Sequence, residues 1–283
     1  MTPFAIAGVQ APVAHGTDNI PALARTIRHA LHRFPWVRMV VLSELAAYGY
    51  LPQNAEPPGG AAETAFRALA RQHGIWLIPG SHFERVDDKL YNTALAIDPA
   101  GEVVARYRKM FPFLPYETGI EPGTEFCVFD VPEVGRFGLS ICYDMWFPET
   151  TRTLAAMGAE VILHPSLTDT IDRELELQIA RTSAALNQCY FFDINGIEGG
   201  GTGRSIIIDP SGHVLHEAGA GPEFMPVEID LARVRRERSL GLRGLGQLLK
   251  SFRDRPVEFP VYGKAFDTRF LDSLGPLEKP KRG

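Results

Sequence analysis

Short apolar runs alternate with longer amphipathic stretches along most of the chain, and this alternation limits the possible folds more than any other feature. Runs rich in Val, Ile and Phe predict strands, and the amphipathic stretches between them predict helices. Such an alternation is typical of α/β proteins. The predicted strands are 4–9, 37–42, 75–79, 93–97, 103–107, 126–129, 137–141, 161–163, 190–194, 205–208, 214–216 and 224–229.

Two of the predicted helices have start signals. Asp18 can cap a helix over 19–34, and Asp172 can cap a helix over 173–187. Apolar residues repeat at helical spacing in both, which predicts one buried face for each. In the second helix these residues are Leu175, Ile179 and Leu186.

The order of the elements repeats within the chain. One matched pair of segments has the pattern strand, Asp-Pro-x-Gly turn, strand, and the other two pairs are strands at the same place in each half. The pairs are 94–103 with 205–214, 4–10 with 137–143, and 74–79 with 189–194. Two half-sheets with helices on one side each would bury their bare faces against each other. The sequence therefore predicts a four-layer α-β-β-α sandwich of two pseudo-symmetric halves.

Composition argues against several classes of protein. The formal net charge of −5 leaves no basic excess for nucleic acid, and no apolar stretch is long enough to span a membrane. The first residues lack the basic start of a signal peptide. Three cysteines without close spacing suit a reducing compartment, so we expect a cytoplasmic protein without a structural metal or cofactor.

Cys142 is the best candidate for a nucleophile. It ends the apolar strand 137–141 and precedes a turn into a helix, where a thiol is exposed and a helix N-terminus favours the thiolate. Cys127 and Cys189 lie within apolar runs and are expected to be inert core thiols. We expect Asp144 to cap the helix that follows.

A cysteine hydrolase needs a base, and more than one side chain at a predicted strand end could serve. His164, Glu44 and Lys109 each follow an apolar run. Sites of α/β proteins assemble at the carboxyl ends of strands. A Cys142–His164 pair would suit a thioesterase or acyltransferase, whereas Glu44 and Lys109, taken singly, could equally be a salt-bridge carboxylate and an exposed cation.

Three motifs, in order, resemble the signatures of the nitrilase, or carbon-nitrogen hydrolase, superfamily. They are Ser43-Glu44 after an apolar strand, Tyr107-Arg108-Lys109, and the run 138–149, which reads GLSICYDMWFPE around Cys142. The resemblance covers roughly residues 4 to 263 and implies the four-layer sandwich that the internal repeat suggests independently. It also implies one carbon-nitrogen hydrolase domain over 1–263. The tail 264–283 is less regular, with Pro276, Pro280 and a basic end, and this predicts a C-terminal arm that could contact another subunit.

The resemblance implies a role for each matching residue. Glu44 would take the proton from Cys142 and later activate water, and Cys142 would attack the carbonyl carbon. Lys109, with the backbone N–H of Tyr143, would stabilise the tetrahedral oxyanion. The implied activity needs no metal or cofactor.

Amidase members of the superfamily also carry a second glutamate between the lysine and the cysteine. Glu117, eight residues after Lys109 (117 − 109 = 8), is the preferred candidate over Glu121. Its expected role is to hold the substrate amide and the lysine in place.

The sequence around Cys142 is similar to amidase and carbamoylase versions of the motif rather than to nitrilases. We therefore expect an amidase that releases ammonia from a small carboxamide through a thioester. Within the superfamily, the alternatives are an N-carbamoyl amino acid or amine amidohydrolase and a nitrilase. An alternative of another functional class is a non-catalytic assembly protein that keeps only the fold. Expected pocket residues are Tyr48, Phe113, Tyr143 and Trp146.

Two further expectations concern ligands and partners. Arg173 could receive a substrate carboxylate, or it could be an exposed helix residue. The resemblance implies a homodimer or higher homo-oligomer, and a small-molecule amide is the only other expected partner.

Overall fold

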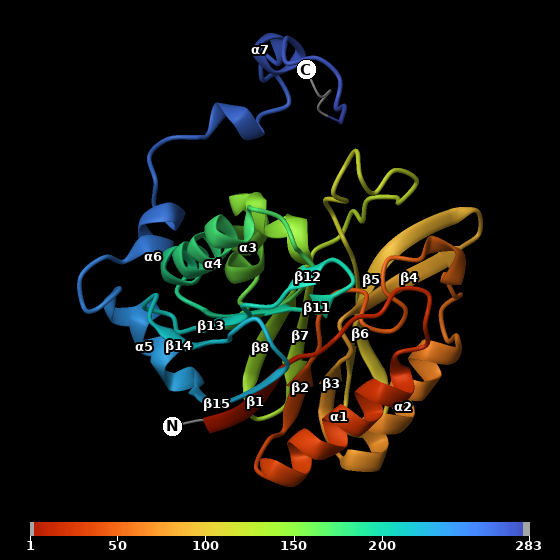
Figure 1. Ribbon diagram of the computed structural model, residues 1–283. Coiled ribbons are helices and arrows are strands. Elements are labelled where there is room, and N and C mark those ends of the chain that lie inside the picture. Colours follow the sequence, from red (N-terminus) through yellow and green to blue (C-terminus); the bar gives the residue numbers. More distant parts are fainter. Residues whose placement is uncertain (1–2, 280–283) are drawn as a thin grey trace.

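The computed structural model describes residues 3–279, and it has two main β-sheets between two layers of helices (Figure 1). In the first sheet the strand order is β15-β1-β2-β3-β5-β4, and β6 pairs with β5. Its strands are β1 (Pro3–Gln10), β2 (Met39–Val41), β3 (Trp76–Ile78), β4 (Ser81–Val86), β5 (Lys89–Ile97), β6 (Val103–Arg108) and β15 (Glu223–Asp230).

The second sheet has the order β14-β13-β10-β9-β8-β7. Its strands are β7 (Cys127–Val131), β8 (Gly135–Leu139), β9 (Val161–Ser166), β10 (Tyr190–Asn195), β13 (Ile206–Ile208) and β14 (Val214–Glu217). A short hairpin of β11 (Ile197–Glu198) and β12 (Gly201–Thr202) lies beside it.

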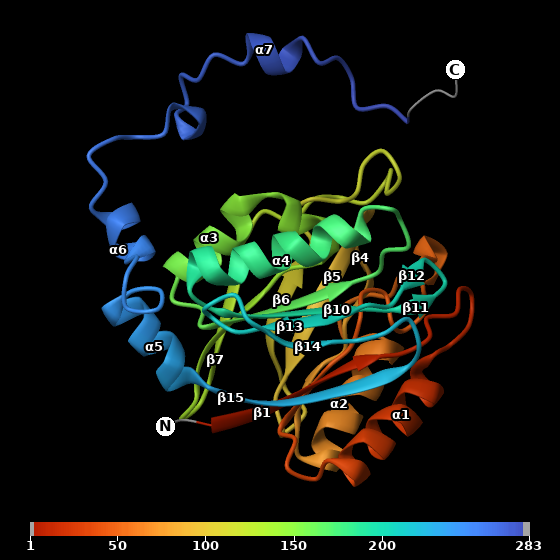
Figure 2. The same ribbon diagram turned by 60° about the vertical axis from the view of Figure 1, so that its left-hand side comes forward.

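Helices cover the outer faces of both sheets. Helices α1 (Ile20–Arg33) and α2 (Ala61–His73) pack on the first sheet, and α3 (Pro148–Ala156) and α4 (Arg173–Asn187) pack on the second (Figure 2). The remaining helices are α5 (Leu231–Leu240), α6 (Leu248–Arg253) and α7 (Arg269–Asp272), with short 3-10 helices at Pro52–Asn54, Cys142–Trp146 and Pro260–Tyr262.

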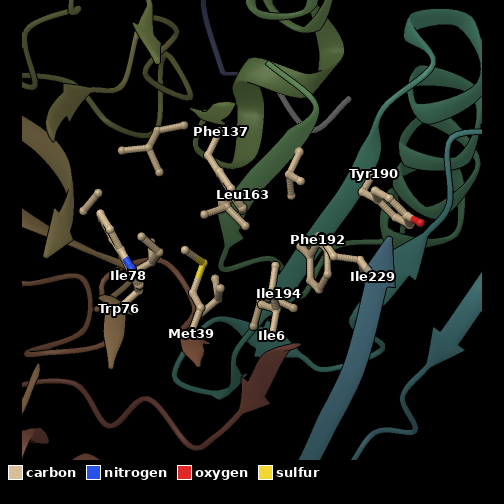
Figure 3. Packing of buried hydrophobic residues seen from close by; sticks show 14 of the residues in the cluster. Ile6, Met39, Trp76, Ile78, Phe137, Leu163, Tyr190, Phe192, Ile194 and Ile229 are labelled. Atoms are coloured by element: carbon tan, nitrogen blue, oxygen red, sulfur yellow. The ribbon is translucent and has the colours of Figure 1, made fainter. Parts of the chain in front are cut away.

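Buried apolar side chains fill the spaces between the layers. The largest cluster joins the two sheets, and Figure 3 shows Ile6, Met39 and Ile78 from the first sheet meeting Phe137 and Phe192 from the second. Two further clusters lie between each sheet and its helices. The prediction of a four-layer α-β-β-α sandwich is confirmed.

The two halves have the same design. Strands β1-β2-β3-β5-β6 are neighbours in this order in the first sheet, and β8-β9-β10-β13-β14 are neighbours in the second. Asp98 Oδ1 accepts two backbone N–H groups in the turn after β5, and Asp209 Oδ1 does the same after β13. A short aspartate side chain closes such turns by binding its own backbone, which explains the repeated Asp-Pro-x-Gly sequence.

Some local predictions were wrong. Strand β4 was not predicted, because its sequence, Ser-His-Phe-Glu-Arg-Val, has few apolar residues. In α4 the residues Leu175 and Leu186 are exposed, and the buried face instead carries charged and small residues. Asp18 accepts the N–H of Ile20, whereas the Asp172 side chain makes no cap bond at the start of α4.

The chain leaves the body of the protein after α6, and every residue from 256 to 279 is exposed (Figure 2). The predicted arm, 264–283, is described to residue 279; its last four residues lie outside the described part. Two contacts of this segment with the body are a hydrogen bond from the Tyr262 hydroxyl to Glu149 and the Lys279 ammonium, 5.2 Å from the ring centroid of Tyr116. Within residues 3–279, no helix is long and apolar enough to cross a membrane.

Candidate active site

Side chains from both halves meet around a cavity of about 500 Å³ at the carboxyl ends of the strands. Glu44 follows β2, Lys109 follows β6 and Cys142 follows β8, and all three line this cavity. Glu117, on the long loop between β6 and β7, lines it too, whereas Glu121 is exposed and lies outside it. The structure thus brings together the four residues to which the sequence assigned the chemistry.

Lys109 lies between two carboxylates. Its side chain is 1% exposed, and Nζ donates to Glu44 Oε1 and to Glu117 Oε2, each at 2.9 Å. Burial alone would lower the pKa of Lys109, but the two carboxylates raise it well above its usual value. The ammonium therefore stays charged, as a cation inside a buried site does only when it is paired.

Glu44 is held by partners from neighbouring strands. Asn92 Nδ2 on β5 donates to Glu44 Oε1 at 2.7 Å, and the backbone N–H of Glu44 donates to the Ser166 carbonyl at the end of β9. Burial raises the pKa of Glu44, Lys109 opposes this, and Glu117 adds to it. Glu44 is consequently a stronger base than an exposed glutamate and is fixed beside the cavity.

Glu117 is positioned by its own loop. The loop runs above the sheets between β6 and β7 (Figure 1), and the backbone N–H of Phe113 donates to Glu117 Oε2. The N–H of Gly123 donates to the Lys109 carbonyl, and this bond holds the end of the loop beside its start. One carboxylate oxygen of Glu117 therefore accepts from both Lys109 and the loop backbone.

Cys142 lies on a sharp turn. It has a φ of 46°, a left-handed conformation that residues other than glycine rarely adopt, and it opens a 3-10 helix instead of α3 itself. Burial and then the Glu44 carboxylate raise the pKa of its thiol well above the usual value, while Lys109 and the N–H of Leu167 act in the opposite direction. The resting sulfur is therefore a thiol that needs a base, and Glu44 is its side-chain hydrogen-bond partner.

Asp144 stabilises this turn through side-chain hydrogen bonds and does not cap α3. Its Oδ2 accepts from the N–H of Ile141 and from the Tyr107 hydroxyl, and its Oδ1 accepts from the N–H of Phe111. Burial raises the pKa of Asp144 to about 6, although each of these donors opposes the rise. The contacts connect the turn at Cys142 to the segment that carries Lys109.

His164 lies in the core and does not line the cavity. It is fully buried, its Nδ1 lies 2.6 Å from Ser140 Oγ, and its ring packs at 5.2 Å from the Phe191 ring centroid. Burial lowers the pKa of His164 to about 4, so the ring is neutral near pH 7. This placement argues against the Cys142–His164 pair.

Three of the four predicted pocket residues line the cavity, and the fourth does not. Phe113, Tyr143 and Trp146 line the cavity. The prediction for Tyr48 is wrong, because its hydroxyl donates to Glu56 at 2.7 Å and its ring lies in a separate small hollow. Tyr50, two residues later, lines the cavity instead.

Both predictions for Arg173 are also wrong. The side chain is 3% exposed, so it is not a surface residue, and it does not line the cavity. Its guanidinium contacts Asp193 Oδ2 at 2.8 Å and Glu176 Oε2 at 3.3 Å, and it donates to the Arg204 carbonyl. These partners leave Arg173 unavailable for a substrate carboxylate.

Several cavity residues were missed in the sequence. They come from the loop after β9, from the first turn of α4, from the β11–β12 turn and from the segment after β1, and include Asp169, Asp172, Glu176, Gly199 and His15. A signal was available for the first group, since a polar run directly after a buried strand lies at the same sheet edge as Cys142.

The other two cysteines lie away from the cavity. Burial raises the pKa of Cys127 to about 11 and that of Cys189 to about 12. Neither is paired in a disulfide. Across residues 3–279, no group of three His, Cys, Asp or Glu side chains is arranged to hold a metal ion.

Comparisons with known proteins agree with this geometry. Residues 5–239 match the carbon-nitrogen hydrolase family. The human omega-amidase NIT2 is 29% identical over 83% of this chain and 91% of its own length. The 2-oxoglutaramate amidase of Bacillus subtilis is 33% identical over 68% of this chain and 78% of its own length. A nitrilase of Pyrococcus abyssi is 34% identical over 78% of this chain and 86% of its own length.

Solved structures with similar folds include two from the same superfamily. Saccharomyces cerevisiae Nit3, of the nitrilase superfamily, superposes with a TM-score of 0.78 at 28% identity and covers 84% of this chain and 94% of its own. A variant of the Nesterenkonia sp. AN1 amidase carries the acetamide moiety of fluoroacetamide on its active-site cysteine. Its structure has a TM-score of 0.74 at 25% identity and covers 83% of this chain and 94% of its own. The fold, the three motifs and the family match together show that this chain belongs to the carbon-nitrogen hydrolase family.

Proposed function

We propose that this protein is an amidase that hydrolyses small carboxamides and releases ammonia through a thioester on Cys142. The observation that carries the proposal is the buried Glu44–Lys109–Glu117 cluster, which lies beside the Cys142 thiol at the same cavity. The amidases among the similar proteins support a carboxamide over a nitrile.

The first half-reaction forms the thioester. Glu44 takes the thiol proton as the Cys142 sulfur attacks the carbonyl carbon, and the carbonyl oxygen becomes an oxyanion. The Lys109 ammonium and the backbone N–H of Tyr143 stabilise this oxyanion. Glu44 then gives its proton to the nitrogen as the C–N bond breaks, so that ammonia leaves and the acyl group remains on sulfur.

The second half-reaction regenerates the thiol. Glu44 takes a proton from water as its oxygen attacks the thioester carbon, and the same donors stabilise the second oxyanion. Collapse of this intermediate breaks the C–S bond, and the sulfur recovers the proton from Glu44. The products are a carboxylic acid and free enzyme.

The electrostatics of the cluster suit this cycle. The raised pKa of Glu44 makes it a better proton acceptor from a thiol whose own pKa is raised. The ammonium of Lys109 stays charged throughout because two carboxylates flank it. Glu117 has the positioning role, since its oxygen already holds Lys109 and the loop backbone.

A panel of primary amides, ureas, N-carbamoyl amines and nitriles, scored by ammonia release, tests the proposal. We expect turnover of short amides and acylation of Cys142, detected by mass spectrometry of acid-quenched protein. Turnover confined to ureas, carbamoyl compounds or nitriles would replace the amidase assignment by one of the other activities of the family.

We further propose a homodimer or higher homo-oligomer and a cytoplasmic location. The exposed C-terminal segment carries apolar side chains, among them Phe259, Tyr262 and Phe270, which supports burial against a second copy of the chain. The three unpaired cysteines support a reducing compartment. Light scattering of the full chain tests the first point, with the monomer mass as the contradicting result.

A further inference from the structure

The charge of the cavity is unbalanced. Among the described residues that line it are five carboxylates and a single Lys or Arg side chain, that of Lys109. The carboxylates are those of Glu44, Glu117, Asp169, Asp172 and Glu176. Two of them, Glu44 and Glu117, pair with Lys109. The other three carboxylates do not pair with Lys109.

Within residues 3–279, a nearby cation offsets the charge of only one of these three carboxylates, that of Glu176, which pairs with Arg173 at 3.3 Å. Arg173 lies outside the cavity and already contacts Asp193 as well as Glu176. Arg204 pairs with two other glutamates at the surface. His15 lines the cavity, and its Nδ1 accepts the N–H of Tyr50. A substrate carboxylate would therefore meet uncompensated negative charge.

Glu176 is the carboxylate best placed to contact a ligand. It is 5% exposed and lines the cavity from the first turn of α4, and its charge acts on the Cys142 thiol. Its two contacts are long, 3.4 Å from Trp146 Nε1 and 3.3 Å from Arg173. A carboxylate accepts about four hydrogen bonds, so Glu176 has acceptor capacity left for a donor in the cavity.

The rim of the cavity is also suited to cations. Asp169 is exposed there, and no hydrogen-bond or ion-pair partner contacts it within residues 3–279. Asp172 accepts from the Thr170 hydroxyl. Tyr116, which lines the cavity, already has the Lys279 ammonium against its ring. An ammonium group approaching the cavity would be attracted first by the rim and then by Glu176.

We propose that the preferred substrate is a small amide whose acyl chain ends in a protonated amine, with Glu176 as the residue that contacts the ammonium. Asp169 and Asp172 attract the cation to the rim. This inference rests on the proposed amidase function, and it identifies the substrate class of the same site.

Matched primary amides test the inference. Butyramide, gamma-aminobutyramide and succinamate differ in the terminal group, and valeramide, delta-aminovaleramide and glutaramate form a longer series. We expect kcat/KM to be highest for the amino amide in at least one series, by about tenfold over the neutral amide, with the carboxylate amide slowest in both. Higher ionic strength should reduce the advantage of the amino amide.

Variants that replace a carboxylate by a neutral amide test whether Asp169, Asp172 and Glu176 cause the preference for the amino amide. The double variant Asp169→Asn/Asp172→Asn and the single variant Glu176→Gln should each lower the ratio of amino to neutral amide, measured within the same variant, by about threefold or more. The matched control is Glu133→Gln/Glu228→Gln, which removes two exposed carboxylates outside the cavity and should leave the ratio unchanged.

The outcomes separate this inference from the proposed function. Hydrolysis of amides with no preference for the amino amide, or with a preference for the carboxylate amide, overturns the inference and leaves the amidase intact. A preference that persists in the Asp169/Asp172 and Glu176 variants and does not respond to salt overturns the assignment of these residues. Absence of ammonia release from every amide, including the neutral ones, overturns the amidase function itself.

Discussion

Replacement of Glu44 by glutamine removes the base while keeping the shape of the site. Glu44 Oε1 accepts from Asn92 Nδ2 at 2.7 Å and from Lys109 Nζ at 2.9 Å. The carbonyl oxygen of a glutamine can take the place of Oε1 and keep both bonds, whereas its amide nitrogen cannot accept a proton. The variant therefore isolates proton transfer from packing.

The expected loss of activity follows from the role of the group. Removal of a positioned proton-transfer group typically costs roughly 10² to 10⁴ in rate, or about 3 to 5 kcal/mol in the barrier. The change in stability should be smaller, about 1 to 2 kcal/mol. The Asn92 bond becomes a neutral one and the Lys109 bond loses its carboxylate charge, while the repulsion from Glu117 disappears. Ammonia release and urea unfolding measure the two quantities.

Glu44→Gln should lower amidase activity but increase the reactivity of Cys142 toward alkylating reagents. The Glu44 carboxylate raises the pKa of the Cys142 thiol, so its removal should lower this pKa, and alkylation of Cys142 should begin at lower pH than in the wild type. The variant would have more thiolate at a given pH and yet much less amidase activity. A folded variant that releases ammonia at the wild-type rate would refute the assignment of Glu44 as the base.

Three further predictions concern neighbouring residues. Glu117→Gln should still let Cys142 react with an activated ester but lose most amide turnover, measured as the ratio of ester to amide rates; wild-type amide turnover would exclude the positioning role. Cys127→Ala and Cys189→Ala should keep ammonia release close to wild type, and a loss as large as that of Glu44→Gln in either folded variant would contradict their assignment as inert. His164→Asn should retain most activity and be less acid-sensitive than wild type. Because burial lowers the pKa of His164 to about 4, the unfolded chain binds its proton first as pH falls, and about 3 kcal/mol of folding stability should be lost between about pH 6.5 and 4; unfolding free energies with the same pH dependence in both proteins would contradict this.

The sequence predicted the architecture because its signals are local and repeated. Both Asp-Pro-x-Gly turns use an aspartate side chain that binds its own backbone, so the short motif is sufficient to place a hairpin in each half. Cys142, Glu44 and Lys109 each follow an apolar strand, and the carboxyl ends of these strands meet at one edge.

The errors arise where side-chain direction depends on contacts that are distant in sequence. Tyr48 and Tyr50 differ by only two positions, and the non-repeating backbone between Leu45 and Gly49, both with positive φ, gives no periodicity from which to choose between them. Apolar periodicity in α4 predicted the wrong buried face, because Arg173 is buried through its pairing with Asp193 on β10.

Asn92 shows a signal that was present but not used. It is a fully buried polar residue within strand β5, where an apolar side chain would be expected. A buried amide needs a hydrogen-bond partner, and here the partner is Glu44. A polar residue inside an apolar strand is therefore a useful indicator of a nearby site.

The central claim is that the Cys142 sulfur is the nucleophile for amide hydrolysis. The most direct test is the initial rate of ammonia release from a small primary amide by Cys142→Ala, with circular dichroism and thermal unfolding as checks of the fold. Because the thiol lies on a turn at the cavity and not in the core, we expect a folded variant with no release above the uncatalysed rate. Ammonia release at the wild-type rate by the folded variant would contradict the mechanism.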